Sequence, residues 1–193
     1  MGSENRGIWE SGRLIMRRPF VPTTLFVAAL SATPLAAQAR KFVVPGIRGV
    51  PPTELIDTMG TPREVPFTPI KVFAALEKVY AELKVKPEVH AAPFQIGNQS
   101  FYARSSLAKR RMSAWVECGS GMTGPIADDY KVYLGLVTFV EVTAGNTSIV
   151  RSVLVGNAIN VTEGRLPTQR CKTTGELELM IHEMMVKELT KIE

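Results

Sequence analysis

Hydrophobic positions recur at helical spacing in a segment that follows residue 68 of this 193-residue chain. From residue 69 to residue 86, apolar side chains fall three and four positions apart, with charged residues between them. Thr68 can accept a hydrogen bond from a free amide of the first turn, Pro69 suits the first helical position, and Pro87 stops the pattern. The segment therefore predicts an amphipathic helix that needs a partner surface.

A second segment with helical spacing lies near the C-terminal end of the chain. Its apolar positions are Leu177, Met180, Ile181, Met184, Met185 and Leu189. Thr173 and Glu176 precede most of them with the spacing of a capping box, in which each side chain bonds the other residue's backbone amide. We therefore expect a helix that starts at this box and packs its apolar face on the rest of the domain.

Between these helices the pattern changes to the two-residue period of β-strands. Residues 89–108 predict a hairpin that turns at Gly97–Asn98, and residues 112–118 predict a short strand. Residues 130–143 alternate for most of their length, and a three-residue turn leads into a second long strand over 147–160. The second face of 130–143 is also apolar in its middle, so this strand carries hydrophobic residues on both faces.

These elements predict an α+β domain over residues 69–193. Its sheet is antiparallel with about five strands and has two helices packed on one face, in the order α-β-β-β-β-β-α. Residues 40–68 contain five prolines and three glycines and predict a linker. Proline lacks an amide donor and fixes its own backbone torsion, so we expect neither a regular helix nor a sheet strand through this segment.

The first 39 residues have the pattern of a cleaved bacterial signal peptide. A basic leader precedes an apolar run at residues 25–32, and the segment from Met16 onward has this composition by itself. Small residues near the end of the segment predict a cut between Ala39 and Arg40. The apolar run is shorter than the roughly 20 residues that span a bilayer, so we expect no transmembrane segment after cleavage.

Cleavage would leave 19 basic and 16 acidic residues, a net charge of +3. This mild charge has no concentrated basic stripe and does not indicate nucleic-acid binding. Cys118 and Cys171 both lie in the exported part, where an even cysteine count predicts a disulfide. The sequence contains no clustered metal ligands and no dinucleotide fingerprint, so we expect neither a metal nor a cofactor.

The glycine-rich segment 115–130 concentrates residues that can carry catalysis. Cys118 or Ser120 is a candidate nucleophile, for which His182 would be the base and Asp128 the orienting carboxylate. The segment lacks the G-x-S-x-G spacing of a nucleophile elbow, and its last glycine is followed by proline rather than by a phosphate-binding lysine. We therefore expect a turn-rich loop held at one end by the disulfide.

A short basic cluster is the candidate for contact with an anionic surface. It consists of Arg104, Lys109, Arg110 and Arg111. The alternative interpretation is a solvated connection between strands, because so short a run of charge is common on protein surfaces.

Taken together, these patterns predict an exported, periplasmic or secreted module that binds a partner at the bacterial cell envelope and is not an enzyme. The partner would be an envelope protein, through addition to a sheet edge, or an anionic envelope polymer, through the basic cluster. Two alternatives stay open. One is a hydrolase-type enzyme that uses Cys118 or Ser120 with His182, and the other is a carrier of a small apolar ligand, which the two-sided strand 130–143 favours.

Overall fold

The computed structural model describes residues 39–47, 50–103, 106–143, 145–160 and 168–191, and the predicted signal peptide up to residue 38 lies outside the described residues. Within the described ranges, seven strands form one antiparallel sheet. They are β3 (Arg63–Val65), β4 (Val89–Ala91), β5 (Gln95–Ala103), β8 (Val116–Glu117), β9 (Lys131–Val142), β10 (Ser148–Ile159) and β11 (Thr168–Thr173). The order across the sheet is β4-β5-β9-β10-β11-β8, and β3 pairs with β10.

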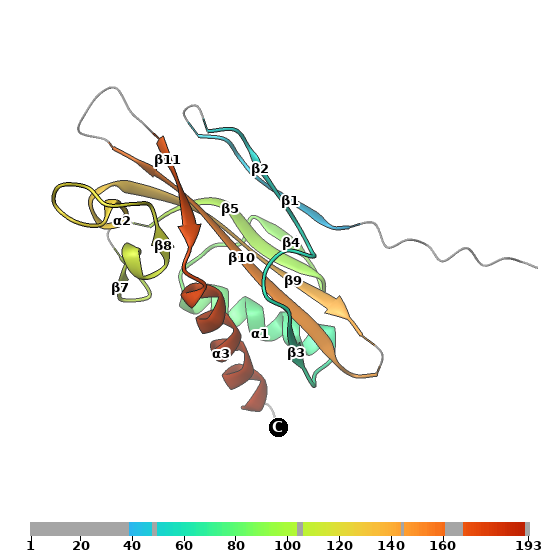
Figure 1. The fold of residues 1–193 in the computed structure, drawn as a ribbon. Helices are drawn as coiled ribbons and strands as arrows, with labels where there is room; N and C mark the ends of the chain where they lie inside the picture. The colour runs from blue at the N-terminus through green and yellow to red at the C-terminus, as the bar shows by residue number, and fades with distance from the viewer. Residues whose placement is uncertain (1–38, 48–49, 104–105, 144, 161–167, 192–193) are drawn as a thin grey trace, which may run out of the picture. The chain divides into compact units, whose positions relative to one another are not determined.

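Helices cover one face of this sheet. α1 (Pro69–Glu82) and α3 (Glu176–Thr190) lie side by side there, α1 against β9 and β5 and α3 against β10 (Figure 1). The predicted α+β class, with an antiparallel sheet and helices on one face, is confirmed. The sheet has two more strands than expected, β3 from the segment interpreted as a linker and β11 from the segment before the C-terminal helix, whose sequence TQRCKT lacks a clear apolar alternation.

The pairing of β9 with β10 is the longest in the sheet and runs from Lys131↔Ile159 to Val142↔Ser148. This confirms the predicted long hairpin. Alternate β9 residues face the helices and join the main core with α1 and α3. The remaining positions face the other side of the sheet, where Val137 and Phe139 are also fully buried.

A small hairpin buries that second face. It is formed by β1 (Lys41–Val44) and β2 (Thr53–Ile56), and it packs Phe42, Val44 and Leu55 against Val137 and Phe139 (Figure 1).

The prediction of a linker without sheet structure over residues 40–68 is therefore wrong. Four of the prolines stand between β1, β2 and β3, and Pro66 follows β3, so each lies outside the strands at a position where the sheet requires no amide donor. The hairpin also accounts for the apolar second face of β9, which was the observation that favoured a carrier of apolar ligands.

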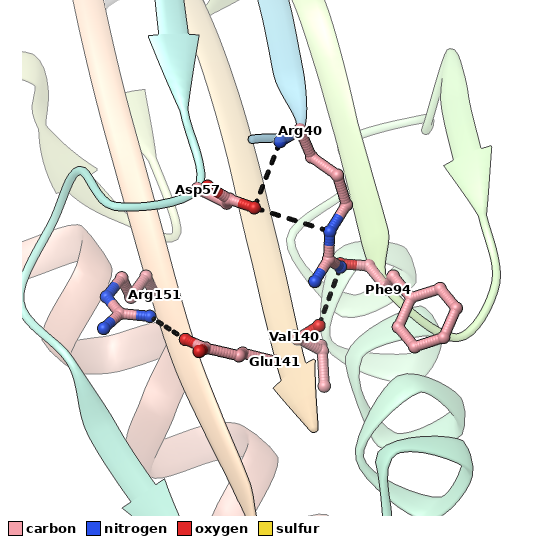
Figure 2. Close-up of polar contacts among 6 residues, drawn as sticks. All are labelled: Arg40, Asp57, Phe94, Val140, Glu141 and Arg151. Carbon is pink, nitrogen blue, oxygen red and sulfur yellow. Dashed lines mark hydrogen bonds and ion pairs between the residues drawn. The ribbon is translucent and has the colours of Figure 1, made fainter. Parts of the chain in front are cut away.

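Arg40 fastens the open end of this hairpin to the sheet (Figure 2). Its backbone N–H donates to Asp57 Oδ2 at 3.1 Å, and its Nε lies 3.5 Å from the same oxygen. Its Nη1 donates to the carbonyl oxygens of Phe94, at 3.0 Å, and Val140, at 2.9 Å. The guanidinium also lies over the Phe94 ring, 4.9 Å from the ring centroid. Arg40 thus connects β1 and β2 to the strands beneath them.

The first predicted hairpin turns at a different place. The connection between β4 and β5 spans residues 92–94, and Gly97–Asn98 lies inside β5. A Cβ at Gly97 would sit 2.6 Å from the carbonyl oxygen of Leu136 and 2.9 Å from the Phe42 ring. This glycine allows close packing of neighbouring backbone and of the covering hairpin, which is the other common reason for glycine in a strand.

Both helix starts differ from the expected caps. Thr68 is the N-cap of α1 but makes no side-chain capping bond. Gly175, with φ of 84°, is the N-cap of α3, so the predicted capping box is wrong. Thr173 is still part of β11, and its hydroxyl donates to Glu178 Oε1 at 2.7 Å. α1 ends at Glu82, before the predicted end, because Lys84 takes a left-handed φ of 58° and turns the chain.

The predicted disulfide is confirmed between Cys118 and Cys171. Cys171 lies in β11, and Cys118 follows β8, whose Glu117 pairs with Lys172. The bridge therefore joins neighbouring strands at the edge of the sheet, rather than a central strand to the start of α3. The first three residues of the predicted strand 112–118 instead form a short 3-10 turn, η1 (Met112–Ala114), which is followed by β8.

We predict that Phe42→Ala lowers the free energy of unfolding by about 3–5 kcal/mol, because it leaves a cavity between the hairpin and β9. The matched control is Val43→Ala, since Val43 is 44% exposed while Phe42 is 2% exposed. The control should change the same quantity by no more than about 0.5 kcal/mol. Urea unfolding measures both, and equal effects would mean that residues 40–68 are not part of the core.

We predict that the double substitution Cys118→Ser and Cys171→Ser lowers the free energy of unfolding by about 4 kcal/mol in the chain-entropy model, given the sequence separation of 53. Alkylation of the native protein without reductant, followed by mass spectrometry, should modify neither cysteine. Ready alkylation of Cys118 would contradict the bridge and supply the free thiol that the enzyme alternative needs.

Candidate functional site

The sheet is interrupted beside β10. On the side away from β9, this strand pairs with β3 over Ser148–Val150 and with β11 over Gly156–Ile159. Among the described strands, none pairs with that side over residues 151–155. The chain just before β3 crosses this break so closely that a Cβ at Gly60 would lie 2.7 Å from the carbonyl oxygen of Ser152. Gly60 also has φ of 82°, so both its space and its backbone conformation favour glycine.

A cavity of about 190 Å³ opens at this break, between the sheet and α3. Ser152 of β10 and Arg63 of β3 line it from the sheet, and Thr173 lines it from the end of β11. Glu178 and His182 line it from α3, where their spacing of four positions places both on one face of the helix. We call this space the α3 cavity.

The α3 cavity contains polar atoms that the fold leaves without a partner. Glu178 Oε1 accepts the Thr173 hydroxyl, and the backbone N–H groups of Glu178 and Leu154 are near enough to the carboxylate to lower its pKa. No described group meets hydrogen-bond geometry at the buried Glu178 Oε2. His182 Nδ1 is in the same situation. An unpaired buried polar atom costs about 1–3 kcal/mol, so two of them on residues that line one cavity indicate a role other than stability.

Burial also changes the protonation of these two groups. It raises the pKa of Glu178, and hydrogen bonds to the carboxylate, first of all from Thr173, offset only part of this effect. Burial lowers the pKa of His182, and the positive charge of Arg63 lowers it further, while Glu183 acts in the opposite direction. Both shifts disfavour the charged form of the group, as expected for ionisable groups that are partly removed from water.

A chain of buried hydroxyl groups determines whether the Ser152 hydroxyl donates or accepts a hydrogen bond at the cavity. Tyr80 donates its hydroxyl proton to the carbonyl oxygen of Ile96 at 3.2 Å. The Tyr80 and Thr138 hydroxyls are 3.2 Å apart, and those of Thr138 and Ser152 are 2.9 Å apart. Because Tyr80 has used its only proton, Thr138 must donate to Tyr80, and Ser152 must then donate to Thr138. Ser152 Oγ therefore keeps its lone pairs and is an acceptor at the cavity.

Sequence reasoning missed this site for a physical reason. Glu178 and His182 are visible as a pair of polar residues four positions apart, bordering the apolar face of the C-terminal helix. Arg63 and Ser152 come from distant segments, and only the pairing of β3 with β10 brings them to the same cavity. His182 had been considered as a base for Ser120, but it lines the α3 cavity instead.

The glycine-rich loop, whose residues were the catalytic alternative, has structural contacts among its described residues. Cys118 is bonded to Cys171 and provides no thiol nucleophile. Asp128, in the short helix α2 (Ile126–Asp129), accepts hydrogen bonds from the backbone N–H of Ser113 at 2.9 Å and from its hydroxyl at 2.8 Å. This carboxylate therefore anchors the loop to Ser113.

The predicted basic cluster lies at a separate hairpin. Arg104 falls outside the described residues. Lys109 is in the turn between β6 (Ser106–Leu107) and β7 (Arg110–Arg111), where it has a positive φ of 63°. Lys109 and both arginines of β7 are exposed.

Arg110 differs from its two neighbours because the fold already engages its charge. Its Nη1 lies 3.6 Å from Glu176 Oε2, and its guanidinium lies over the Trp115 ring at 4.6 Å from the centroid. Within this hairpin, Lys109 and Arg111 are therefore the charges that are positioned to meet an anionic partner.

Comparison with known proteins gives no further guide, since no family model, curated protein or solved structure matches this chain. Across the described ranges, no helix is both long and apolar enough to cross a bilayer. The same ranges contain no group of three or more His, Cys, Asp or Glu residues that could hold a metal ion. The disulfide is compatible with a location outside the cytoplasm.

We predict opposite pH dependences for two substitutions in the α3 cavity. A raised pKa means that the folded protein binds the Glu178 proton more tightly, so the wild type loses stability relative to Glu178→Gln as pH rises above 4.5. A lowered pKa means that folding disfavours protonated His182, so the wild type loses stability relative to His182→Gln as pH falls below 6.5.

Melting temperatures of the three proteins between about pH 4 and pH 8 test this prediction, since this window spans the ordinary pKa values of Glu and His. Glu82→Gln is the control, because Glu82 is exposed at the end of α1 and does not line the α3 cavity. Its curve should stay parallel to that of the wild type. Parallel curves for the two cavity variants as well would show that neither group is perturbed by folding.

Proposed function

We propose that this chain is an exported, non-enzymatic binding module and that the α3 cavity is its ligand site. The observation that carries the proposal is the pair of buried, unpartnered atoms on one helix face, Glu178 Oε2 and His182 Nδ1. A bound ligand would supply the missing hydrogen bonds and recover the free energy that folding alone leaves unsatisfied.

The chemistry of the α3 cavity selects the kind of ligand. Ser152 accepts a hydrogen bond, Arg63 donates, and Glu178 Oε2 and His182 Nδ1 offer buried polar atoms without a partner among the described residues. An uncharged group with both donors and acceptors, such as an amide or a set of hydroxyls, matches this arrangement and avoids the cost of burying a charge.

The size of the α3 cavity adds a second restriction. Its volume of about 190 Å³ is below the range of roughly 300–1,000 Å³ that holds drug-sized ligands. The site would therefore take a small molecule or one group of a larger envelope molecule.

A binding role is also supported by the absence of an activated nucleophile at the α3 cavity, judged from its described lining. Ser152 is the lining serine, and its proton is already donated to Thr138 rather than to His182. Nucleophilic catalysis by serine needs the opposite arrangement, in which the hydroxyl donates to a base.

The proposed location is the periplasm or the exterior of a bacterial cell. The disulfide favours an oxidising compartment, and the pattern of residues 1–39 is that of a secretory signal. The partner there would be an envelope protein or polymer that presents a small polar group to the α3 cavity.

We predict that His182→Phe and Glu178→Leu each reduce retention of the purified protein on washed envelope fractions at least tenfold. Tenfold corresponds to about 1.4 kcal/mol, which lies within the range for a lost hydrogen bond to a buried group. The matched controls are His90→Phe and Glu183→Leu, because His90 is exposed and paired with Glu77, and Glu183 is exposed on α3. Wild-type retention of both cavity variants would reject the α3 cavity as the ligand site.

The basic hairpin provides the competing prediction, because Lys109 and Arg111, two positions apart, are both exposed. If an anionic polymer binds there, Lys109→Glu combined with Arg111→Glu should abolish retention, and added salt should weaken retention of the wild type. Arg110 is left unchanged in this variant, because its contacts with Glu176 and Trp115 belong to the fold. The same assay therefore separates the two surfaces.

A further inference from the structure

The residue that should follow the predicted cut is already bonded through its backbone nitrogen. Arg40 N lies 3.1 Å from Asp57 Oδ2, and the Arg40 Nε lies 3.5 Å from the same oxygen (Figure 2). Arg40 and Asp57 stand just beyond the last pair of the β1–β2 hairpin, Lys41↔Ile56, and Asp57 N donates back to the Arg40 carbonyl at 3.2 Å. This contact closes the open end of the hairpin.

We propose that cleavage of the Ala39–Arg40 peptide bond is a maturation step that locks this hairpin onto the sheet. Water adds across the bond, Ala39 leaves as a carboxylate, and the new amine of Arg40 takes up a proton at neutral pH. The same nitrogen that donates one neutral hydrogen bond then carries a positive charge next to the Asp57 carboxylate. The proposal rests on the export stated in the proposed function.

The geometry favours this step because little has to move. The Arg40 nitrogen is already within ion-pair distance of Asp57, whose side chain is 22% exposed, so the new charge is partly shielded from solvent. A charge-assisted hydrogen bond is roughly twice as strong as a neutral one. The guanidinium of Arg40 keeps its bonds to the carbonyl oxygens of Phe94 and Val140, which hold the new terminus in place. Ala39 is exposed, as a cleavage site must be.

The consequence reaches the core of the second sheet face. Phe42 follows Arg40 by two positions and is buried against Val137 and Phe139. An Arg40 that is held in place directly before β1 therefore limits fraying of the β1–β2 hairpin, which covers this face of the sheet. The mature protein should be more stable than a chain in which Arg40 N is still a peptide nitrogen.

The test compares exported proteins made from the full chain. The wild-type chain should yield a mature form that starts at Arg40, as mass spectrometry would show. A second chain, with Thr-Gln inserted after residue 39, keeps the cut after Ala39 and places no small residue before Arg40, so it should mature with two extra residues and a neutral Arg40 amide. We expect the wild-type form to melt about 2–4 °C higher, the shift that corresponds to one added interaction in a domain of this size.

Two further measurements show whether the α-ammonium of Arg40 causes the difference in melting temperature between the two mature forms. Asp57→Asn should abolish the difference between the two forms, whereas Glu141→Gln, which breaks the neighbouring ion pair with Arg151, should preserve it (Figure 2). The difference should also vanish above about pH 9, where an α-amine is no longer protonated.

The outcomes separate this inference from the proposed function. Equal melting temperatures, or a difference that Asp57→Asn leaves intact, would overturn the lock and leave the binding role standing. Failure of export, or a mature start at a residue other than Arg40, would also overturn it, and failure of export would count against the proposed location as well.

Discussion

The twelve-residue pairing between β9 and β10 is the constraint on which the other elements depend. Each strand presents alternate residues to opposite faces of the sheet, and β9 is apolar on both. The apolar β9 side chains on one face of the sheet are buried by helices, and those on the opposite face need a second element to bury them. α1 and α3 provide the first cover and the β1–β2 hairpin provides the second, so Phe42, Val44 and Leu55 of this hairpin are part of the core.

The β9–β10 hairpin also creates the α3 cavity. On its side away from β9, β10 is longer than either of the two strands that pair with it. β3 pairs with one end of β10 and β11 with the other, and the middle remains without a strand. α3 then passes over this break and places Glu178 and His182 above it. The α3 cavity thus results from a mismatch in strand length inside a tightly packed sheet, where few spaces of this size persist.

The α3 cavity is where buried polar atoms without a partner gather among the described residues. Elsewhere, the hydroxyl chain from Tyr80 to Ser152 is paired, while Gln95 Nε2 and Asn157 Oδ1 lack a partner singly and do not line this cavity. At the cavity, two buried polar atoms are left unpaired, at a cost to stability that packing must offset. Such local exceptions to the general pattern are where function is expected, and the proposed ligand would remove this one.

By itself, the sequence determined what local periodicity and composition can encode. It determined the α+β class, the long hairpin and the existence of both helices, and it pointed to the disulfide through the cysteine count. It misplaced the turn at Gly97–Asn98 and the cap of α3, because glycine and threonine have several local uses and only neighbouring elements select one. Tertiary structure alone decided that the proline-rich segment covers the second face of β9, and that Arg63, Ser152, Glu178 and His182 share a cavity. The physical reason is that strand pairing and register join residues far apart in the chain, and no short-range pattern records that pairing.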